Sequence, residues 1–273
     1  MVGDGFRVHN FFPNGYKLKM SPFFLLDYNS KIQFSARNEP RGVGVHPHRG
    51  FETVTIAYHG AVAHHDSAGN SGIIYPGDVQ WMTAASGILH KEYHEEAFSK
   101  QGGAFQMVQL WVNLPAKDKM SKPKYQAISQ AQIAKHQLPD HAGLVAVIAG
   151  EYLGTKGSAS TFTPIHAYNL RLNKTGKATF NFPADFNTAF VVIEGEIKVN
   201  DTEIAKADQM IHFKNEGEQI FVEGIQDSVV LILSGEPINE PITHYGPFLM
   251  NKPEEIQQAI ADYNQGKFGY LEE

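Results

Sequence analysis

Short strand-like segments recur along the whole of this 273-residue chain, and they limit its fold more than any other feature. Early examples are FFLLDY (23–28), FETVTIAY (51–58), GIIYP (72–76) and FQMVQLWVNL (105–114), separated by turns rich in Gly, Pro and Asp. Side chains in a strand alternate between two faces, and many short strands at this spacing are typical of a sandwich or barrel. The pattern therefore predicts an all-β protein.

A second β-rich series follows a polar stretch at 114–129, which Pro115 and Pro123 interrupt and which we predict to be a surface loop. Its members are GLVAVIAGEY (143–152), HAYNLRLN (166–173), KATFNFP (177–183), TAFVVIEGEIKVN (188–200), QIFVEG (219–224) and SVVLILSGEP (228–237). The apolar periodicity lapses within 128–142, so we predict two domains, 1–132 and 133–273. One order of segments appears in both halves: FETVTIAYHG precedes GDVQWM in the first, and TAFVVIEGEIKV precedes ADQMIHF in the second. This indicates that the same structural unit is used twice.

One segment has helical rather than strand periodicity, NKPEEIQQAIADYNQGKFG at 251–269. Pro253 and the two following Glu suit a first turn, and Gly266 supplies a stop. Ile256, Ile260 and Tyr263 fall on one face. We predict a short helix that ends the second domain and packs without taking part in chemistry.

Charge and composition exclude several functions. A net charge of −6 disfavours direct binding of nucleic acid or anionic lipid. The absence of Cys excludes disulfides, thiolate metal sites and cysteine nucleophiles. We find neither an apolar leader nor a window of roughly 18 apolar residues that could span a membrane. We therefore expect a cytoplasmic protein without membrane contact, and a monomer.

Two His-containing pairs lie in predicted strands, HPH at 46–48 and HKE at 90–92. Residues two apart in a strand point to the same side, so His46 and His48 would project together, as would His90 and Glu92. Facing each other inside a small barrel, the pairs would form a site of three imidazoles and one carboxylate. Isolated histidine pairs are more often structural, and the second pair is what favours a metal site.

This ligand set suits one divalent transition metal ion and leaves coordination positions open. We expect Fe(II) first, with Ni, Co, Mn, Cu or Zn as alternatives. Open positions distinguish a working site from a closed structural one.

The same segments resemble the two sequence motifs of the cupin barrel. His46, His48, Glu52 and Gly60 match the first motif, and Gly77, Gly87 and His90 match the second, with Ala85 where Pro is usual. A narrower resemblance is to the pirin family. It is carried by HPHRGFETVT, HHDSAGNSG, GDVQWMTA and GILHKE, and by the C-terminal run GEPINEPITHYGPFLMN. The AASG at 84–87 departs from the A-G-R-G usual in pirins. The resemblance covers nearly the whole chain.

The resemblance implies a bicupin, two jelly-roll barrels packed together with a short C-terminal helix, in which only the N-terminal barrel binds metal. It assigns His46, His48, His90 and Glu92 as ligands. The second half has IEGEIKV where we align the ligand strand of the first, with no histidine pair. His166, His212 and His244 are interpreted as structural.

Several nearby residues are expected to support the site or the fold. We expect Glu52 to line the pocket or orient a ligating imidazole, with direct coordination as the alternative. His64 and Asp66 match a pirin stretch, but a turn stabilised by Asp66, Ser67 and Asn70 is the preferred interpretation. Trp81 and Met82 are expected in the core or the pocket wall.

Some pirins oxidise flavonols such as quercetin with O₂, opening the central ring and releasing carbon monoxide. The resemblance therefore implies a quercetin 2,3-dioxygenase-like oxidoreductase acting on a small phenolic substrate, with Glu92 as the catalytic base for the flavonol 3-hydroxyl. The alternative is an iron-dependent regulator that binds a transcription factor or metabolic enzyme. A third possibility is a bicupin acting on another small enolic or phenolic compound.

Overall fold

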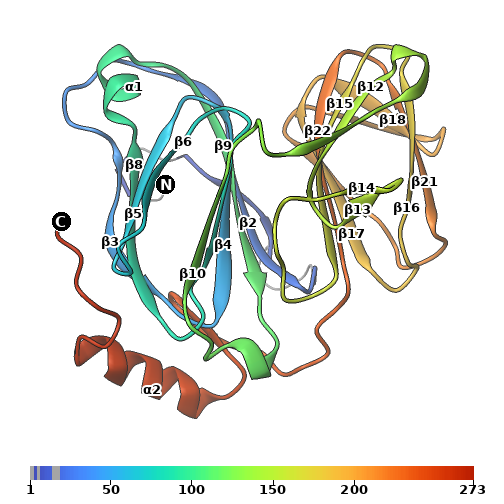
Figure 1. Cartoon of the computed structure of the whole chain (residues 1–273). Coiled ribbons are helices and arrows are strands. Elements are labelled where there is room, and N and C mark those ends of the chain that lie inside the picture. Colours follow the sequence, from blue (N-terminus) through green and yellow to red (C-terminus); the bar gives the residue numbers. More distant parts are fainter. Residues whose placement is uncertain (1–2, 5–6, 14–18) are drawn as a thin grey trace. The chain divides into compact units, whose positions relative to one another are not determined.

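The computed structural model describes residues 3–4, 7–13 and 19–273, which form two compact units (Figure 1). The first unit comprises the described part of Met1–Lys19 together with Phe23–Gln130 and Ile238–Glu273. The second comprises Met20–Pro22 and Ala131–Pro237. Each unit is built from antiparallel strands, which confirms the predicted all-β class and its two jelly-roll barrels.

The barrel of the first unit consists of two sheets. A six-stranded sheet has the order β1-β2-β9-β4-β7-β10, and a four-stranded sheet has the order β3-β8-β5-β6. The strands are β1 (His9–Phe12), β2 (Phe23–Phe34), β3 (Gly42–His48), β4 (Phe51–His59), β5 (Val62–Asp66), β6 (Ser71–Ile74), β7 (Val79–Thr83), β8 (Ile88–His94), β9 (Gly103–Asn113) and β10 (Lys124–Ile128). Helix α1 (Glu96–Gln101) joins β8 to β9, and a 3-10 turn (Ala116–Asp118) follows β9.

The second unit repeats this arrangement with a six-stranded sheet, β11-β12-β15-β22-β17-β20, and a four-stranded sheet, β16-β21-β18-β19. Buried side chains from both sheets, among them Phe180, Phe190 and Val222, form one hydrophobic core. The strands are β11 (Ala134–Gln137), β12 (Gly143–Ala149), β15 (Ile165–Leu172), β16 (Lys177–Asn181), β17 (Asn187–Glu194), β18 (Glu196–Val199), β19 (Glu203–Lys206), β20 (Gln209–His212), β21 (Gln219–Gly224) and β22 (Ser228–Gly235), with a small hairpin of β13 (Glu151–Tyr152) and β14 (Thr155–Lys156) and a 3-10 turn (Pro139–His141).

The shared strand order shows which segments of the two barrels correspond. Strands β3 to β9 of the first unit occupy the same sheet positions as β16 to β22 of the second. The predicted repeat of β4 and β7 in β17 and β20 is therefore correct. The alignment of IEGEIKV with the ligand strand is wrong, because those residues belong to β17 and β18, the counterparts of β4 and β5.

Two other sequence predictions differ from the structure. The predicted loop at 114–129 contains β10, which pairs with β7 along its full length, from Lys124 opposite Thr83 to Ile128 opposite Val79. The C-terminal segment, predicted to end the second domain, packs in the first unit. It contains β23 (Thr243–Tyr245), β24 (Phe248–Met250) and α2 (Pro253–Asn264), whose apolar residues contact Leu89 of β8.

Neither described α-helix, α1 or α2, is long and apolar enough to cross a membrane.

Helix α2 is attached to the first barrel by a buried ion pair. Arg49, in the turn after β3, donates from Nη1 to Oδ2 of Asp262 at 2.9 Å, and its guanidinium stacks over the ring of Phe268 at 4.6 Å. Lys267 and Gln258 both donate to Oδ1 of Asp262 at 2.8 Å. The hydrogen bonds from Lys267, Arg49 and Gln258 hold the pKa of the Asp262 carboxyl far below its usual range.

We expect Asp262→Asn to destabilise the first unit at neutral pH. A carboxyl whose folded-state pKa lies below the unfolded value stabilises the fold above that unfolded value, and the stabilisation is lost as the pH falls further. The loss of unfolding free energy should therefore be full at pH 5 to 7 and should shrink below the ordinary Asp pKa of 3.8. Denaturant titrations followed by tryptophan fluorescence report this unit, because Trp81 and Trp111 both lie in it.

Asp185→Asn, which removes one exposed carboxylate in the second unit, serves as the charge control. Equal effects of the two substitutions, or an Asp262→Asn effect that does not change with pH, would contradict the assigned role of the ion pair.

Candidate metal centre

Pairing of β3 with β8 determines where the candidate ligands lie. His46 is directly opposite His90, and His48 is opposite Ile88. A bulge at Gly44 and Val45 shifts the register, so that Val43 is opposite Glu92. Because residues two apart in a strand share a face, His46, His48, His90 and Glu92 all lie on one face of the four-stranded sheet.

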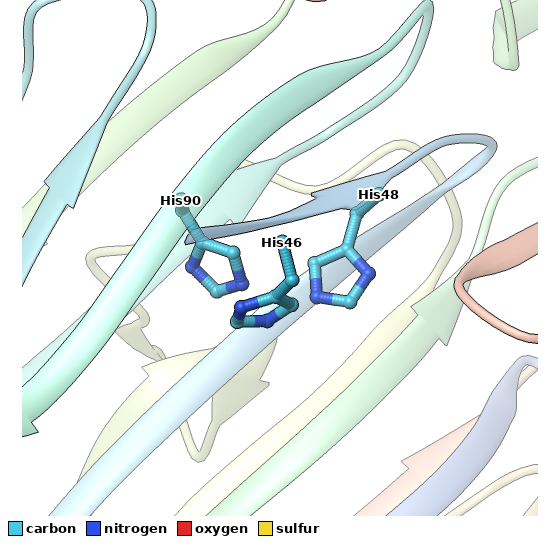
Figure 2. Close-up of side chains that lie close together, drawn as sticks. All are labelled: His46, His48 and His90. Carbon is cyan, nitrogen blue, oxygen red and sulfur yellow. The ribbon is translucent and has the colours of Figure 1, made fainter. Parts of the chain in front are cut away.

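Three imidazoles converge on this face (Figure 2). The ring centroids of His46 and His90 are 4.2 Å apart, those of His48 and His90 4.7 Å, and those of His46 and His48 4.9 Å. One ligand nitrogen from each ring lies within 4.8 Å of the other two. Three nitrogen donors at this separation can reach one ion placed between them, since zinc-type metal–nitrogen bonds are about 2.0–2.1 Å long.

Two rings of the cluster, His48 and His90, are buried, and three of their nitrogens lack the partners that buried imidazoles normally have. His90 is fully buried, and neither of its ring nitrogens has a hydrogen-bond partner in the described part of the chain. The same holds for Nδ1 of His48. Burial, together with the neighbouring histidines, holds the pKa values of His48 and His90 well below the ordinary value. Both rings are therefore neutral, the form that binds metals.

Glu92 is held beside this group by the opposite sheet. Its Oε1 accepts from Thr55 Oγ1 of β4 at 3.1 Å, and its Oε2 accepts from Gln109 Nε2 of β9 at 2.6 Å. The structure places the Glu92 carboxylate within 4.8 Å of His90 and of a further imidazole, His64, rather than in the group with His46 and His48. Two groups of three side chains therefore share His90 and line one polar interior: His46, His48 and His90, and His64, His90 and Glu92.

His64 is the residue that the sequence interpretation undervalued. Its ring is fully buried, stacks on Tyr125 with centroids 5.2 Å apart, and lies on β5 directly opposite Glu92. Gln80 donates to its Nδ1 at 3.1 Å, which leaves the proton of the neutral ring on Nε2. With one nitrogen occupied and the other protonated, His64 is less suited to bind a metal than His90.

Asp66 has the structural role that the sequence predicts. Its Oδ1 accepts from the backbone amides of Ala68 and Asn70, both at 2.9 Å, and thereby closes the turn between β5 and β6. Its Oδ2 also lies 3.6 Å from Nε2 of His64. The alternation of His64 and Asp66 within one strand was a signal that these two side chains share a face.

Glu52 does not face the cluster. The turn at Arg49 and Gly50 separates β3 from β4. His48 and Glu52 are four residues apart, but they lie on different strands and do not share a face. Thr55 of β4 contacts Glu92, and the alternation of a strand then directs Glu52 to the other side of the sheet. There Glu52 accepts from Thr83 Oγ1 at 2.7 Å, and burial raises its pKa to about 7.

Other predicted residues lie where the sequence indicates or outside the cluster. Trp81 and Met82 are both fully buried on β7. His166 bonds with the Tyr168 hydroxyl at 2.7 Å, and His244 with the carbonyl of Gly246 at 2.8 Å. His212 is exposed at the end of β20.

The second barrel lacks the polar interior of the first. Its counterparts of the two ligand strands are β16 and β21, whose buried side chains are Ala178, Phe180, Ile220 and Val222. Among described residues, both groups of potential metal ligands lie in the first unit.

A small cavity reaches Glu92 from one side of the first barrel. It has a volume of about 30 Å³ and is lined in part by Glu92, Gln109, Asp27 and Asn29. This volume accommodates about one water molecule.

Comparison with known protein families agrees with this architecture. Residues 5–112 match the family model for pirins, and residues 167–269 match that for the pirin C-terminal cupin domain. Together the two matches cover most of the chain. The chain belongs to the pirin family, and its fold is that of a bicupin.

Similar proteins cover the same length. A Pseudomonas aeruginosa protein named “Putative quercetin 2,3-dioxygenase” is 48% identical over 98% of this chain and 93% of its own length. Human pirin is 35% identical over 98% of this chain and 90% of its own. The crystal structure of a quercetin 2,3-dioxygenase from Acinetobacter baumannii is 48% identical, with a TM-score of 0.94 over 100% of this chain and 95% of that one.

We expect Glu52→Gln to stabilise the protein above neutral pH. A carboxyl whose folded-state pKa is raised destabilises the fold as the pH rises through the interval from the ordinary 4.5 to about 7. That interval corresponds to about 3 kcal/mol. The variant should therefore exceed wild type by up to that amount at pH 8 and lose its advantage near pH 4, in denaturant titrations at both values. A pH-independent difference would contradict the assignment.

Proposed function

We propose that the first barrel holds one divalent transition metal ion through His46, His48 and His90, with Glu92 as the fourth ligand or its immediate neighbour. The observation that carries this proposal is the set of buried imidazole nitrogens without partners. An imidazole buried without a hydrogen bond costs free energy, and an ion would give Nδ1 of His48 and one ring nitrogen of His90 a partner at once.

The donor atoms fit a first-row ion. Neutral imidazole nitrogens and a carboxylate suit Fe, Ni, Co, Mn, Cu and Zn, whereas Mg and Ca prefer oxygen ligands. Glu92 would leave such a centre with a formal charge near +1, which favours an anionic oxygen ligand. We place Fe(II) first among these ions because of the pirin resemblance.

We further propose that the protein is a quercetin 2,3-dioxygenase-like oxidoreductase. Support comes from two relatives at 48% identity, one named “Putative quercetin 2,3-dioxygenase” and the other a quercetin 2,3-dioxygenase by the name of its crystal structure. When bound, the ion would supply the Lewis acidity and redox chemistry that oxygen insertion requires. The protein's own part is to position the flavonol and to accept its 3-hydroxyl proton.

Glu92 is suited to accept that proton. Thr55 and Gln109 each donate one hydrogen bond to its carboxylate, which fixes its orientation and leaves a lone pair on each oxygen. It also lines the cavity, so a substrate that enters there meets this carboxylate. Around it, Phe51 and Trp111 pack against His48 with ring centroids 5.0 and 5.2 Å away and keep that side of the cluster apolar.

Metal content tests the proposed ligands. Protein purified without added metal should contain about one equivalent of a first-row metal by elemental analysis. His46→Ala and His90→Ala should each reduce this content by more than about tenfold, because each removes one nitrogen donor. His212→Ala, which alters an exposed histidine outside the cluster, should have no effect. Retention of metal in both site variants would contradict the proposal.

Aerobic incubation of the metal-loaded protein with quercetin tests the reaction. We expect loss of the flavonol absorbance and release of carbon monoxide. Glu92→Gln should lower kcat by about 100-fold or more, since general-base catalysis contributes roughly 10²–10⁴. Rates are compared per bound metal, so that loss of the ion is not mistaken for loss of the base.

Smaller phenols and enediols should be assayed beside quercetin. Turnover of these alone would replace the substrate while retaining the site. Metal-loaded protein that oxidises none of them would contradict the oxygenase proposal and favour the regulatory alternative.

A further inference from the structure

The C-terminal tail, defined here as residues 268–273, is bound along the outside of the two strands that carry the proposed ligands. It leaves the end of α2 and runs beside β3 (Figure 1). Ser67 Oγ donates to the carbonyl of Phe268 at 2.6 Å and accepts from the amide of Leu89 at 3.0 Å. Lys91 Nζ donates to the carbonyl of Glu272 at 2.6 Å. The tail is therefore fixed to β8 on both sides of His90.

Its last side chain contacts the other ligand strand. The backbone amide of Val45 donates to Oε2 of Glu273 at 3.2 Å. This amide lies in the bulge of β3, where neither Gly44 nor Val45 has a partner in the β3–β8 register. A bulge residue loses its ladder hydrogen bond, so the amide needs another acceptor, and the tail supplies it.

The other end of the same peptide bond contacts His46. The carbonyl of Gly44, which shares its peptide with the Val45 amide, lies 2.8 Å from Nδ1 of His46. A carbonyl oxygen can only accept, so a neutral His46 carries its proton on Nδ1. Its Nε2 then has the free lone pair that a metal ion requires.

These two hydrogen bonds form one chain through a single peptide group. A carboxylate that accepts from the N–H polarises the peptide and makes its carbonyl a stronger acceptor. The bond to Nδ1 is thereby strengthened, which favours one tautomer and makes Nε2 a better ligand. The carboxylate lies close against this backbone, since a Cβ on Gly44 would meet Oε1 of Glu273 at 2.3 Å.

We propose that Glu273 is a positioning residue for the metal centre. Through the Gly44–Val45 peptide it fixes the tautomer and the ring orientation of His46. The proposal rests on the metal site proposed above, but its first readout does not need a metal.

The test compares Glu273→Ala with Glu272→Ala in the full-length protein. Both variants remove one negative charge from the tail. Only the first removes a bond to β3, because Glu272 contacts Lys91 through its backbone carbonyl, which the substitution retains.

The first readout is the tautomer of His46 in the metal-free protein, from ¹H–¹⁵N spectra of the imidazole nitrogens at pH 8. Wild type and Glu272→Ala should show the Nδ1–H form. Glu273→Ala should show a mixture of both tautomers. An unchanged Nδ1–H form in Glu273→Ala, or an equal change in both variants, would overturn the proposal.

The second readout is the affinity for Co(II), measured by competition with a chromogenic chelator. Glu273→Ala should weaken binding by about three- to tenfold, less than the roughly 10- to 100-fold typical of groups that touch a ligand directly. Glu272→Ala should bind as wild type does. Equal affinity of all three proteins would overturn the positioning role. If wild type itself failed to bind Co(II), the metal proposal would fall, while the tautomer spectra would still decide the role of Glu273.

Discussion

The pairing of β3 with β8 is the constraint on which the candidate site depends. It places His46 directly opposite His90 and brings three imidazoles together without any contribution from loops. Neighbouring strands in a sheet lie about 4.7–4.9 Å apart, which is close to the separation of the rings. Register, rather than proximity in sequence, therefore creates the cluster, and a slip of one residue would turn these side chains to the opposite face.

Local periodicity explains how much of this could be predicted from the sequence. The strands, the shared face of His46 and His48, and that of His90 and Glu92 all follow from the two-residue repeat of a strand. The face of a side chain beyond a turn does not follow from that repeat. The turn at Arg49 and Gly50 resets the alternation, so Glu52 points away from the site. His64 could not be placed because its neighbour Glu92 is fixed by long-range pairing of β5 with β8.

Long-range packing also accounts for the error about the C-terminal segment. Sequence order assigned it to the second domain, whereas Asp262 and Phe268 both contact Arg49 of the first barrel. Lys119 reinforces this attachment, since its buried ammonium donates to carbonyls of Gly50 and Leu249 at 2.7 and 2.8 Å. The chain thus returns to the barrel that carries the candidate ligands after completing the other one. No local pattern could reveal that return.

The apolar interior of the second barrel limits how a second metal centre could be engineered there. Phe180 occupies volume on β16, the strand that corresponds to β3, and the buried hydroxyls of Thr188 and Ser234, on the counterparts of β4 and β9, bond with each other at 2.8 Å. Grafting histidines onto β16 and β21 would therefore give crowded, unsupported imidazoles. A functional copy would require several of these buried apolar side chains to be replaced together.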